Sequence, residues 1–210
     1  MREYAYYTQV LKDQLIPATG CTEPIALAYG AAIAYRTLGA EPERITAAVS
    51  GSIIKNVKSV VVPKTGGMKG IETAIAAGVV AGNPDLELEV LSRITPEEIP
   101  SIHAMLDQCA IREHPSTGDR VFFINVTVAA GEHTACCEIV DFHTNIVRIQ
   151  KDDQNLFQGG STGGKTEQTD RSVLSVEEII AFADCLDPAD VAEVLGRQVA
   201  CNSAISVEGL

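Results

Sequence analysis

A chain of 210 residues with 46% apolar side chains is long enough for one large domain or two small ones with a sizeable core. Its net charge of −12 and the lack of a Lys- and Arg-rich run exclude a nucleic-acid-binding surface, which needs cations against the phosphates. No apolar run is long enough to cross a bilayer, and no basic segment followed by an apolar one indicates a secretory signal. We therefore expect a cytoplasmic protein that binds neither nucleic acid nor membrane.

The N-terminal part predicts a layer of helices rich in Ala and Gly. A short amphipathic helix is expected over residues 4–15. The next helix should run from Thr22 to about Leu38, because Pro24 has the backbone angle of a first helical turn and Thr22 can act as its N-cap. Gly39 is a natural residue to end it. Small residues on nearly every side of this helix predict that it is buried.

The composition changes near Asn83 and Pro84, where alternating strands replace small-residue helices. The alternation of Phe123, Asn125 and Thr127 is typical of a half-buried strand. The remaining expected elements are a strand in the first part of 45–70, a helix at 69–82, a strand at 86–91, a helix at 96–108, strands at 111–114, 121–130, 133–141 and 145–151, and helices at 176–185 and 188–200.

These elements indicate an α+β fold in which an Ala/Gly-rich helical layer carries an inserted small α+β subdomain with a mainly antiparallel sheet. The expected boundaries are an N-terminal helical part at 1–84, the insert at 85–151, a polar linker at 152–174 and the start of a C-terminal helical part at 175–210. The sequence ends on a stretch that resembles the middle of a chain, so we expect an N-terminal portion of a longer protein.

One motif in the expected linker satisfies a phosphate-binding pattern on paper. Residues 159–166, "GGSTGGKT", match G-x-x-x-x-G-K-[ST]. That motif requires a buried strand before it and a helix after it, so that backbone N–H groups converge on phosphate. Neither flank has such a pattern, which argues against nucleotide binding.

Cys21 is the cysteine whose position suggests chemistry. It precedes a helix start, where free N–H groups and the helix dipole favour a thiolate, which is both a nucleophile and an iron ligand. No C-x-x-C spacing occurs, and Cys136 and Cys137 should point to opposite faces of a strand. From spacing alone, a capping or core role for Cys21 is favoured. The six cysteines are Cys21, Cys109, Cys136, Cys137, Cys185 and Cys201.

Four stretches, in order along the chain, resemble the L-cysteine desulfidases, relatives of the iron–sulfur L-serine dehydratase alpha chain. They are "ATGCTEPIALAYGAA" from Ala18, "SGSIIKNVKSVVVPKTGGMKGIETAIAAGVVAG" from Ser50, "FHTNIVRIQKD" from Phe142 and "NSAISVEGL" from Asn202. Together they are specific, whereas each alone would be weak.

The resemblance implies an enzyme that converts L-cysteine to pyruvate, ammonia and sulfide, with an open iron of a 4Fe-4S cluster acting as Lewis acid. The family holds this cluster on three cysteines, of which Cys21 would be one. The other two would come from the missing C-terminal half, so this chain alone should lack a complete cluster. An L-serine dehydratase of the same family, and a non-catalytic scaffold or binding module, remain alternatives. A small amino acid is the expected substrate, and we also expect a homo-oligomer.

The resemblance also suggests roles for polar residues in these motifs, beside simpler structural ones. Lys55, Asn56 and His143 are the catalytic candidates, although a histidine at a strand edge is more often a surface residue. The substrate-binding candidates are Thr65, Gly66, Gly67, Thr144 and Asn145. For the Thr-Gly-Gly stretch, turn formation and an anion-holding loop are equally supported. Glu23 could cap its own helix or orient a ligand.

Overall fold

The computed structural model describes residues 4–116, 118–159 and 169–209. The chain divides into two compact units. The larger comprises Ala18–Gly164, and the smaller combines Met1–Pro17 with Lys165–Leu210. None of the helices in the described ranges is long and apolar enough to cross a membrane.

The larger unit is built on a six-stranded sheet with the order β2-β1-β3-β4-β5-β6. Strand β1 pairs in parallel with β2, and the other neighbouring strands are antiparallel. The fold is therefore α+β, as the sequence predicts. The strands are β1 (Arg44–Val49), β2 (Ala110–Pro115), β3 (Phe123–Ala130), β4 (His133–Val140), β5 (Ile146–Lys151) and β6 (Gln154–Gln158).

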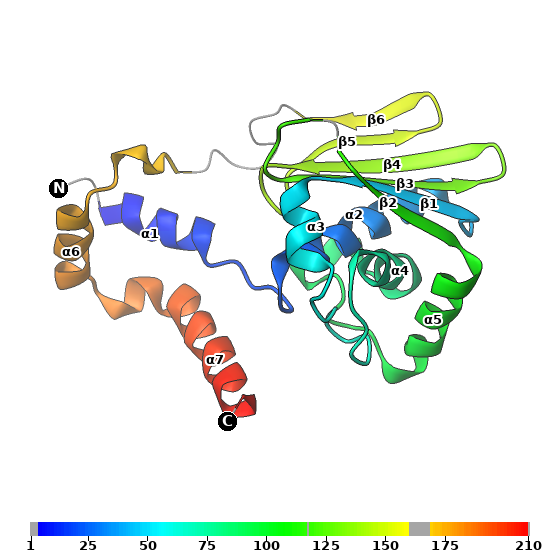
Figure 1. Ribbon diagram of the computed structural model, residues 1–210. Coiled ribbons are helices and arrows are strands. Elements are labelled where there is room, and N and C mark those ends of the chain that lie inside the picture. The colour runs from blue at the N-terminus through cyan, green and yellow to red at the C-terminus, as the bar shows by residue number, and fades with distance from the viewer. Residues whose placement is uncertain (1–3, 117, 160–168, 210) are drawn as a thin grey trace. The chain divides into compact units, whose positions relative to one another are not determined.

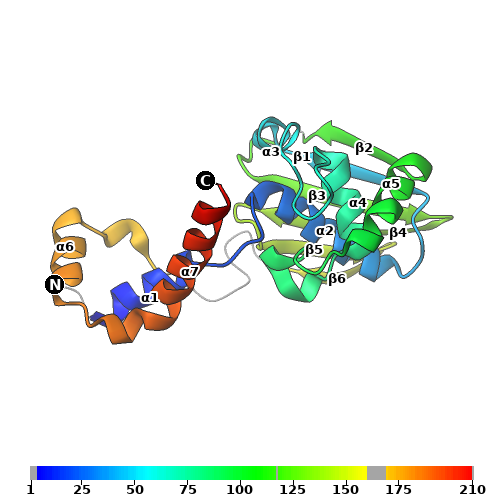
Figure 2. The same cartoon turned by 90° about the horizontal axis from the view of Figure 1, so that it is seen from below.

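Helices cover one face of this sheet (Figure 1). Helix α2 (Thr22–Leu38) packs on β3 and β4 on one side and on α4 (Ile71–Ala81) on the other. Helix α5 (Ile99–Gln108) packs beside α4, and the short helix α3 (Gly51–Val57) follows β1. Figure 2 shows the helical layer from below.

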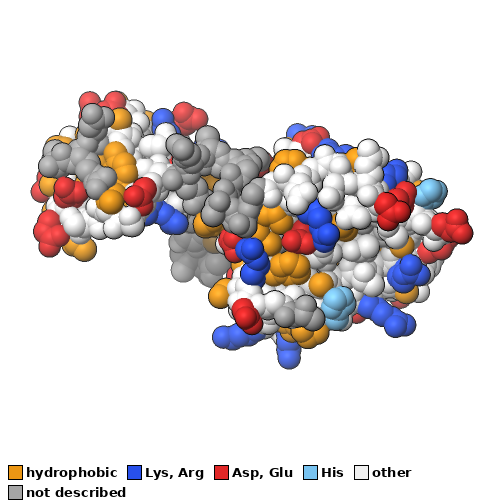
Figure 3. Space-filling model, turned by 90° about the horizontal axis from the view of Figure 1, so that it is seen from above, with side chains coloured by type: hydrophobic (Ala, Val, Ile, Leu, Met, Phe, Trp, Pro, Cys, Tyr) orange, Lys and Arg blue, Asp and Glu red, His pale blue; other side chains and the backbone are white. Residues whose placement is uncertain are grey.

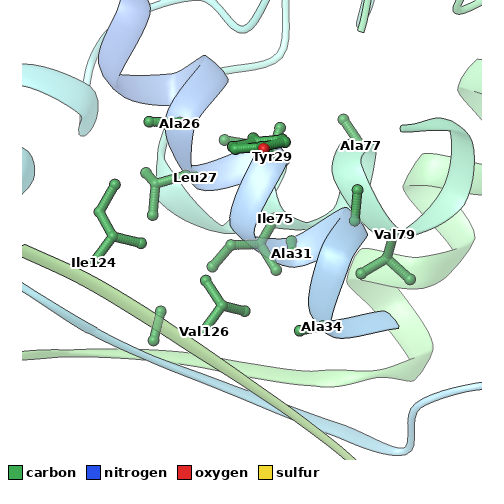
Figure 4. Close-up of a cluster of buried hydrophobic side chains, with 14 of the residues drawn as sticks. Ala26, Leu27, Tyr29, Ala31, Ala34, Ile75, Ala77, Val79, Ile124 and Val126 are labelled. Atoms are coloured by element: carbon green, nitrogen blue, oxygen red, sulfur yellow. The ribbon is translucent and has the colours of Figure 1, made fainter. Parts of the chain in front are cut away.

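Small side chains let α2 and α4 approach closely. A Cβ atom on Gly78 of α4 would lie 2.2 Å from the backbone oxygen of Ala28 in α2, so only glycine fits there. Around this contact, aliphatic side chains from α2, α4 and β3 fill the core, as Figure 4 shows for Leu27, Ile75 and Val126. The predicted burial of the second helix is confirmed, because Pro24 to Ala34 are all buried.

The other face of the sheet is polar. Glu138 of β4 accepts hydrogen bonds from Asn125 of β3 at 3.1 Å and from Arg148 of β5 at 2.9 Å. Seen from that side, acidic and basic side chains are interspersed rather than gathered by sign (Figure 3). The predicted alternation of polar and apolar side chains along β3 is therefore confirmed, with Ile124, Val126 and Val128 in the core.

The smaller unit joins the two ends of the chain. Helix α1 (Tyr4–Gln14) packs on α6 (Val176–Cys185), where the ring of Phe182 lies 4.9 Å from that of Tyr7 and 5.2 Å from that of Tyr4. Tyr7 also donates a 2.9 Å hydrogen bond to Glu178. A 3₁₀ helix (Pro188–Val191) then leads into α7 (Ala192–Glu208).

Most predicted helices and strands are confirmed, and the differences are local. Residues 86–91, expected as a strand, lie in a 3₁₀ helix (Pro84–Glu89) and the turn after it. The expected polar linker begins with strand β6, whose residues are all exposed. The motif at 159–166 falls outside the described residues except for Gly159.

The structure also differs from the expected boundary at residue 84. Strand β1 lies before that boundary, yet it sits between β2 and β3, which lie after it. Residues 85–151 therefore share a sheet and a core with the preceding segment. Conversely, α1 belongs to the smaller unit with the C-terminal helices. Sequence patterns describe single elements, whereas these pairings depend on contacts between distant segments.

Candidate functional site

The candidate site lies at the N-terminal end of α2. Cys21 precedes the helix as its N-cap residue, but its side chain makes no capping hydrogen bond, and Thr22 is already the first helical residue. Before it, Gly20 has a φ of +148°, and a Cβ atom there would lie 2.9 Å from a side-chain carbon of Pro63. The segment that carries Cys21 is thus held against the loop after α3, and the buried helix behind it fixes its position.

The carboxylate of Glu23 connects two of the motifs. Its Oε2 accepts hydrogen bonds from the Cys21 thiol at 3.2 Å and from the Thr22 hydroxyl at 3.4 Å. Its Oε1 accepts one from the side-chain amide of Asn56, on α3, at 3.2 Å. Burial alone would raise the pKa of Glu23, but the bonds from Cys21, its own backbone amide and Asn56, with His143 nearby, hold the pKa below its ordinary value. Glu23 is therefore ionised at neutral pH.

This carboxylate changes the chemistry expected of Cys21. Partial burial and the hydrogen bond to Glu23 both raise the pKa of the thiol, and they outweigh the opposing effect of a backbone amide at the helix start. The side chain is exposed. The expected thiolate is therefore not the resting form. Cys21 is a thiol that donates a hydrogen bond to an ionised carboxylate.

His143 brings the third motif to the same place. It lies in the turn between β4 and β5, half-buried, with its ring edge-on to Phe122 at 4.6 Å. Burial lowers its pKa, and the negative charge of Glu23 partly opposes this. The imidazole is therefore neutral at pH 7. Its Nε2 is buried and has no hydrogen-bond partner among the described residues.

Four of the other predicted residues, namely Thr65, Gly66, Gly67 and Asn145, stabilise or form their own turns. Thr65 is buried, and its hydroxyl donates to the backbone oxygen of Val62 at 2.8 Å. Gly66 and Gly67 have φ values of +71° and +92°, so glycine is required there for the turn itself. The Asn145 amide donates to the Val140 oxygen at 2.9 Å. Lys55 is exposed on α3, beside Asn56 in sequence, and Thr144 is half-buried.

The cysteines show what this chain could contribute to a metal cluster. Cys109, Cys136 and Cys137 are buried in the larger unit, and burial raises the pKa of each. Cys185 and Cys201 are exposed in the smaller unit. Among the described residues, no group of three His, Cys, Asp or Glu side chains is arranged to hold a metal ion. The residues present supply one accessible thiol at the site, so a three-cysteine cluster does not fit within the described part of the chain.

The arrangement joins a thiol, an ionised carboxylate and a neutral imidazole from segments far apart in sequence. Glu23 accepts the hydrogen bond of the thiol and can stabilise a proton taken up by His143, because its negative charge acts on both groups. The sequence suggests a cap or an orienting group at Glu23, and in the structure this carboxylate is the shared hydrogen-bond partner of Cys21 and Asn56. The signal that could have found it is the Thr-Glu-Pro start, where the carboxylate lies in the first helical turn.

A separate cavity lies at the other end of α2. Its volume is about 710 Å³, and it is lined by residues of the α2–β1 connection, α4 and α5, including Tyr35, Glu41 and Met105. Tyr35 donates a 2.6 Å hydrogen bond to Glu41 there. None of the predicted site residues lines this cavity.

Comparison with known proteins finds relatives that are all named UPF0597 proteins. No known family profile and no solved structure matches the chain. A UPF0597 protein from Desulfitobacterium hafniense is 44% identical over 210 residues, which is all of this chain and 49% of that protein. UPF0597 proteins from Fusobacterium nucleatum and Treponema denticola are 41% and 39% identical over 204 and 208 residues, covering 96% and 97% of this chain and 48% of each relative. The chain spans about half the length of the curated relatives it matches.

Proposed function

We propose that this chain is part of an iron–sulfur-dependent lyase that converts L-cysteine to pyruvate, ammonia and sulfide by β-elimination. The observation that supports this most directly is the convergence of three motifs on one carboxylate. Cys21 and Asn56 hydrogen-bond to Glu23, and His143 is electrostatically coupled to it. Packing of the hydrophobic core would not by itself bring a thiol, an amide and an imidazole together at the exposed start of a helix, so this convergence supports a functional role.

In this proposal the chain's own residues handle protons and position the substrate. Neutral His143 accepts the proton from Cα, the electron pair of that bond forms the Cα=Cβ double bond, and the Cβ–S bond breaks with its electrons leaving on sulfide. The proton on His143 leaves with the sulfide as hydrogen sulfide, the enamine becomes an imine, and water then releases pyruvate and ammonia. Glu23 stabilises the imidazolium that forms, because opposite charges at close range favour the protonated ring.

The cluster, when the complete protein holds it, would supply Lewis-acid activation of the substrate, and Cys21 is the ligand that this chain would contribute. Lys55, which is exposed on α3, would attract the substrate carboxylate. Thr65, Gly66, Gly67, Thr144 and Asn145 stay candidates for shaping the pocket through their turns. The Ala/Gly-rich layer of α2 and α4 would serve as the rigid support for the α2 N-terminus. Cytoplasmic location and homo-oligomer formation belong to the same proposal.

The test is anaerobic turnover by the full-length protein that contains this sequence. Pyruvate and sulfide should form together from L-cysteine, in equal amounts. Pyruvate from L-serine but not from L-cysteine would instead identify the ammonia-lyase alternative. A folded, iron-loaded protein that releases pyruvate from neither amino acid would contradict the proposal and favour the non-catalytic scaffold.

A further inference from the structure

Helix α7 lacks the packing that a helix of its length normally has. Of its 17 residues, Val194 is the buried one, and every residue from 196 to 208 is exposed. This exposed part includes Val199, Ile205 and Val207, whose exposed fractions are 62%, 67% and 76%. Figure 1 draws this helix in orange to red. An isolated helix of about this length is marginal in water, because most helical stability in proteins comes from tertiary packing.

Helix α6, in the same unit, adds a second set of exposed aliphatic side chains. Val176, Ile179 and Ile180 are 68%, 45% and 56% exposed, whereas Phe182 on the same helix packs against α1. Single exposed apolar residues are ordinary, but Val176, Ile179 and Ile180 have the i, i+3, i+4 spacing of one helix face, and neighbouring exposed apolar residues are typical of an interaction surface. We call the six residues Val176, Ile179, Ile180, Val199, Ile205 and Val207 the α6–α7 surface.

The length of the relatives indicates what covers this surface. The match with the Desulfitobacterium hafniense protein includes all of this chain, and therefore α7, yet it leaves 51% of that relative unmatched, since 100% − 49% = 51%. The relatives from Fusobacterium nucleatum and Treponema denticola leave a similar share. In these proteins the sequence of α7 is thus part of a chain twice as long.

We propose that the α6–α7 surface is the docking surface for the remaining half of the full-length polypeptide. The proposal does not depend on the lyase activity. The negative charge of residues 176–208 also predicts the charge of the half that docks here. Residues 176–208 contain seven carboxylates (Glu177, Glu178, Asp184, Asp187, Asp190, Glu193 and Glu208) and one cation, Arg197. The docking half should therefore present an apolar patch flanked by Lys or Arg.

The same charges argue against a second copy of this chain as the occupant. An isologous contact through α6 would bring Glu177 and Glu178 towards their copies, and like charges across an interface oppose association. The larger unit of the same chain is the other candidate for covering the α6–α7 surface, and the experiment below distinguishes it from the remaining half of the polypeptide.

Amide hydrogen exchange on two proteins tests the proposal. The 210-residue chain is compared with the intact Desulfitobacterium hafniense relative. We expect amides aligned with residues 196–208 to exchange at least about 100-fold more slowly in the intact relative than in this chain, while amides of α2 are protected in both. Equal exchange of the α7 segment in the two proteins would overturn the proposal. Slow exchange already present in the monomeric 210-residue chain would also overturn it, in favour of the larger unit.

Variants test whether the named side chains carry the contact. They are made in a chimera that joins this chain to the unmatched half of the same relative. Ile205→Asp should raise α7 exchange at least about 10-fold. The matched control is Val121→Asp, because Val121 is 80% exposed in the larger unit and should have no effect on α7. Unchanged α7 exchange in Ile205→Asp would contradict the assignment of the surface. A dimer of the 210-residue chain that Ile205→Asp converts to monomer in sedimentation would contradict it too, because a second copy would then be the occupant.

Discussion

Helices α2 and α7 are each 17 residues long, yet their surroundings are opposite. Helix α2 is enclosed by α4 and the sheet, and its buried residues run without a break from Pro24 to Ala34. Helix α7 is exposed from residue 196 onward. Helix length and propensity alone therefore do not decide a helix's environment. The enclosed helix provides the fixed platform that a precise site needs, whereas the exposed one is available for assembly.

Removing the same side-chain atoms from both helices tests this contrast with the largest expected effect on folding. Ile25 is fully buried in α2, and Ile205 is 67% exposed in α7. Ile25→Ala should lower the free energy of unfolding by about 2–5 kcal/mol, because the transfer energy is lost and a cavity remains. Ile205→Ala should change it by less than about 0.5 kcal/mol. Urea unfolding of the 210-residue chain measures both.

The comparison would fail if both variants lost similar stability. A large loss in Ile205→Ala would mean that α7 already packs against another surface in the isolated chain. A small loss in Ile25→Ala would mean that the α2 core is not as tightly packed as its full burial indicates.

At the N-terminal end of α2, a substitution should greatly reduce activity while changing stability very little. In the full-length protein, Cys21→Ser should reduce turnover at least roughly 100-fold, since losing even an outer partner of a metal ligand commonly costs 10–100-fold. Stability should change by less than about 0.5 kcal/mol, because serine is a good N-cap residue. Pyruvate formation from L-cysteine, iron content and thermal unfolding are measured together.

The matched control for this site is a cysteine in the exposed helix. Cys201→Ser in α7 should leave turnover and iron content unchanged, because Cys201 is exposed in the smaller unit and has no role in the proposed site. If Cys21→Ser kept both iron and turnover, the ligand role of Cys21 would be wrong.

Replacing glycine by alanine should have opposite effects on stability in the two helical regions. At Gly78 an added methyl group would lie 2.2 Å from the Ala28 backbone oxygen, so Gly78→Ala should destabilise the chain by about 1–3 kcal/mol. At Gly196 no atom lies within 4 Å of an added Cβ, so Gly196→Ala should stabilise α7 by about 0.5–1 kcal/mol. Chemical denaturation and helix content by circular dichroism measure the pair. Destabilisation by Gly196→Ala would show that α7 packs closely at that position.

Local sequence signals predicted the elements well, since each depends on nearby residues. The Pro24 start and the Gly39 end of α2 are confirmed, with Gly39 at a φ of +75°. The pairing of β1 with both β2 and β3 could not be predicted this way, because it joins residues about 65 to 85 positions apart, such as Arg44 with Ala110 and with Ala129. Residues 86–91 alternate like a strand, but Pro84 and the turn chemistry of Asn83 produce a 3₁₀ helix.

In the candidate site, too, local motifs predicted which residues matter, whereas their interactions depend on contacts between distant segments. Cys21, Asn56 and His143 were named from their motifs, and the structure brings them to Glu23. The helix dipole alone predicts a thiolate at Cys21, but in the structure partial burial, followed by the hydrogen bond to Glu23, raises the pKa of this thiol above its ordinary value. The roles of Thr65 and Asn145 in their turns were visible only once their hydrogen-bond acceptors were known.

The smallest expected effect concerns pH and the turn that carries His143. Burial lowers the pKa of His143 in the folded chain, so the unfolded chain binds a proton more readily near pH 6.5. The sign follows from this difference: His143 favours unfolding as the pH falls below about 6.5 and has no such effect above it. His143→Gln should therefore lose less stability than the parent chain between about pH 7.5 and pH 5.5. His103, which is exposed on α5, provides the control, and His103→Gln should follow the parent chain. Urea midpoints at the two pH values decide the matter. A parent chain and a His143→Gln variant with the same pH dependence would show that the imidazole is not held neutral by burial, and the proton-accepting role proposed for it would lose its physical basis.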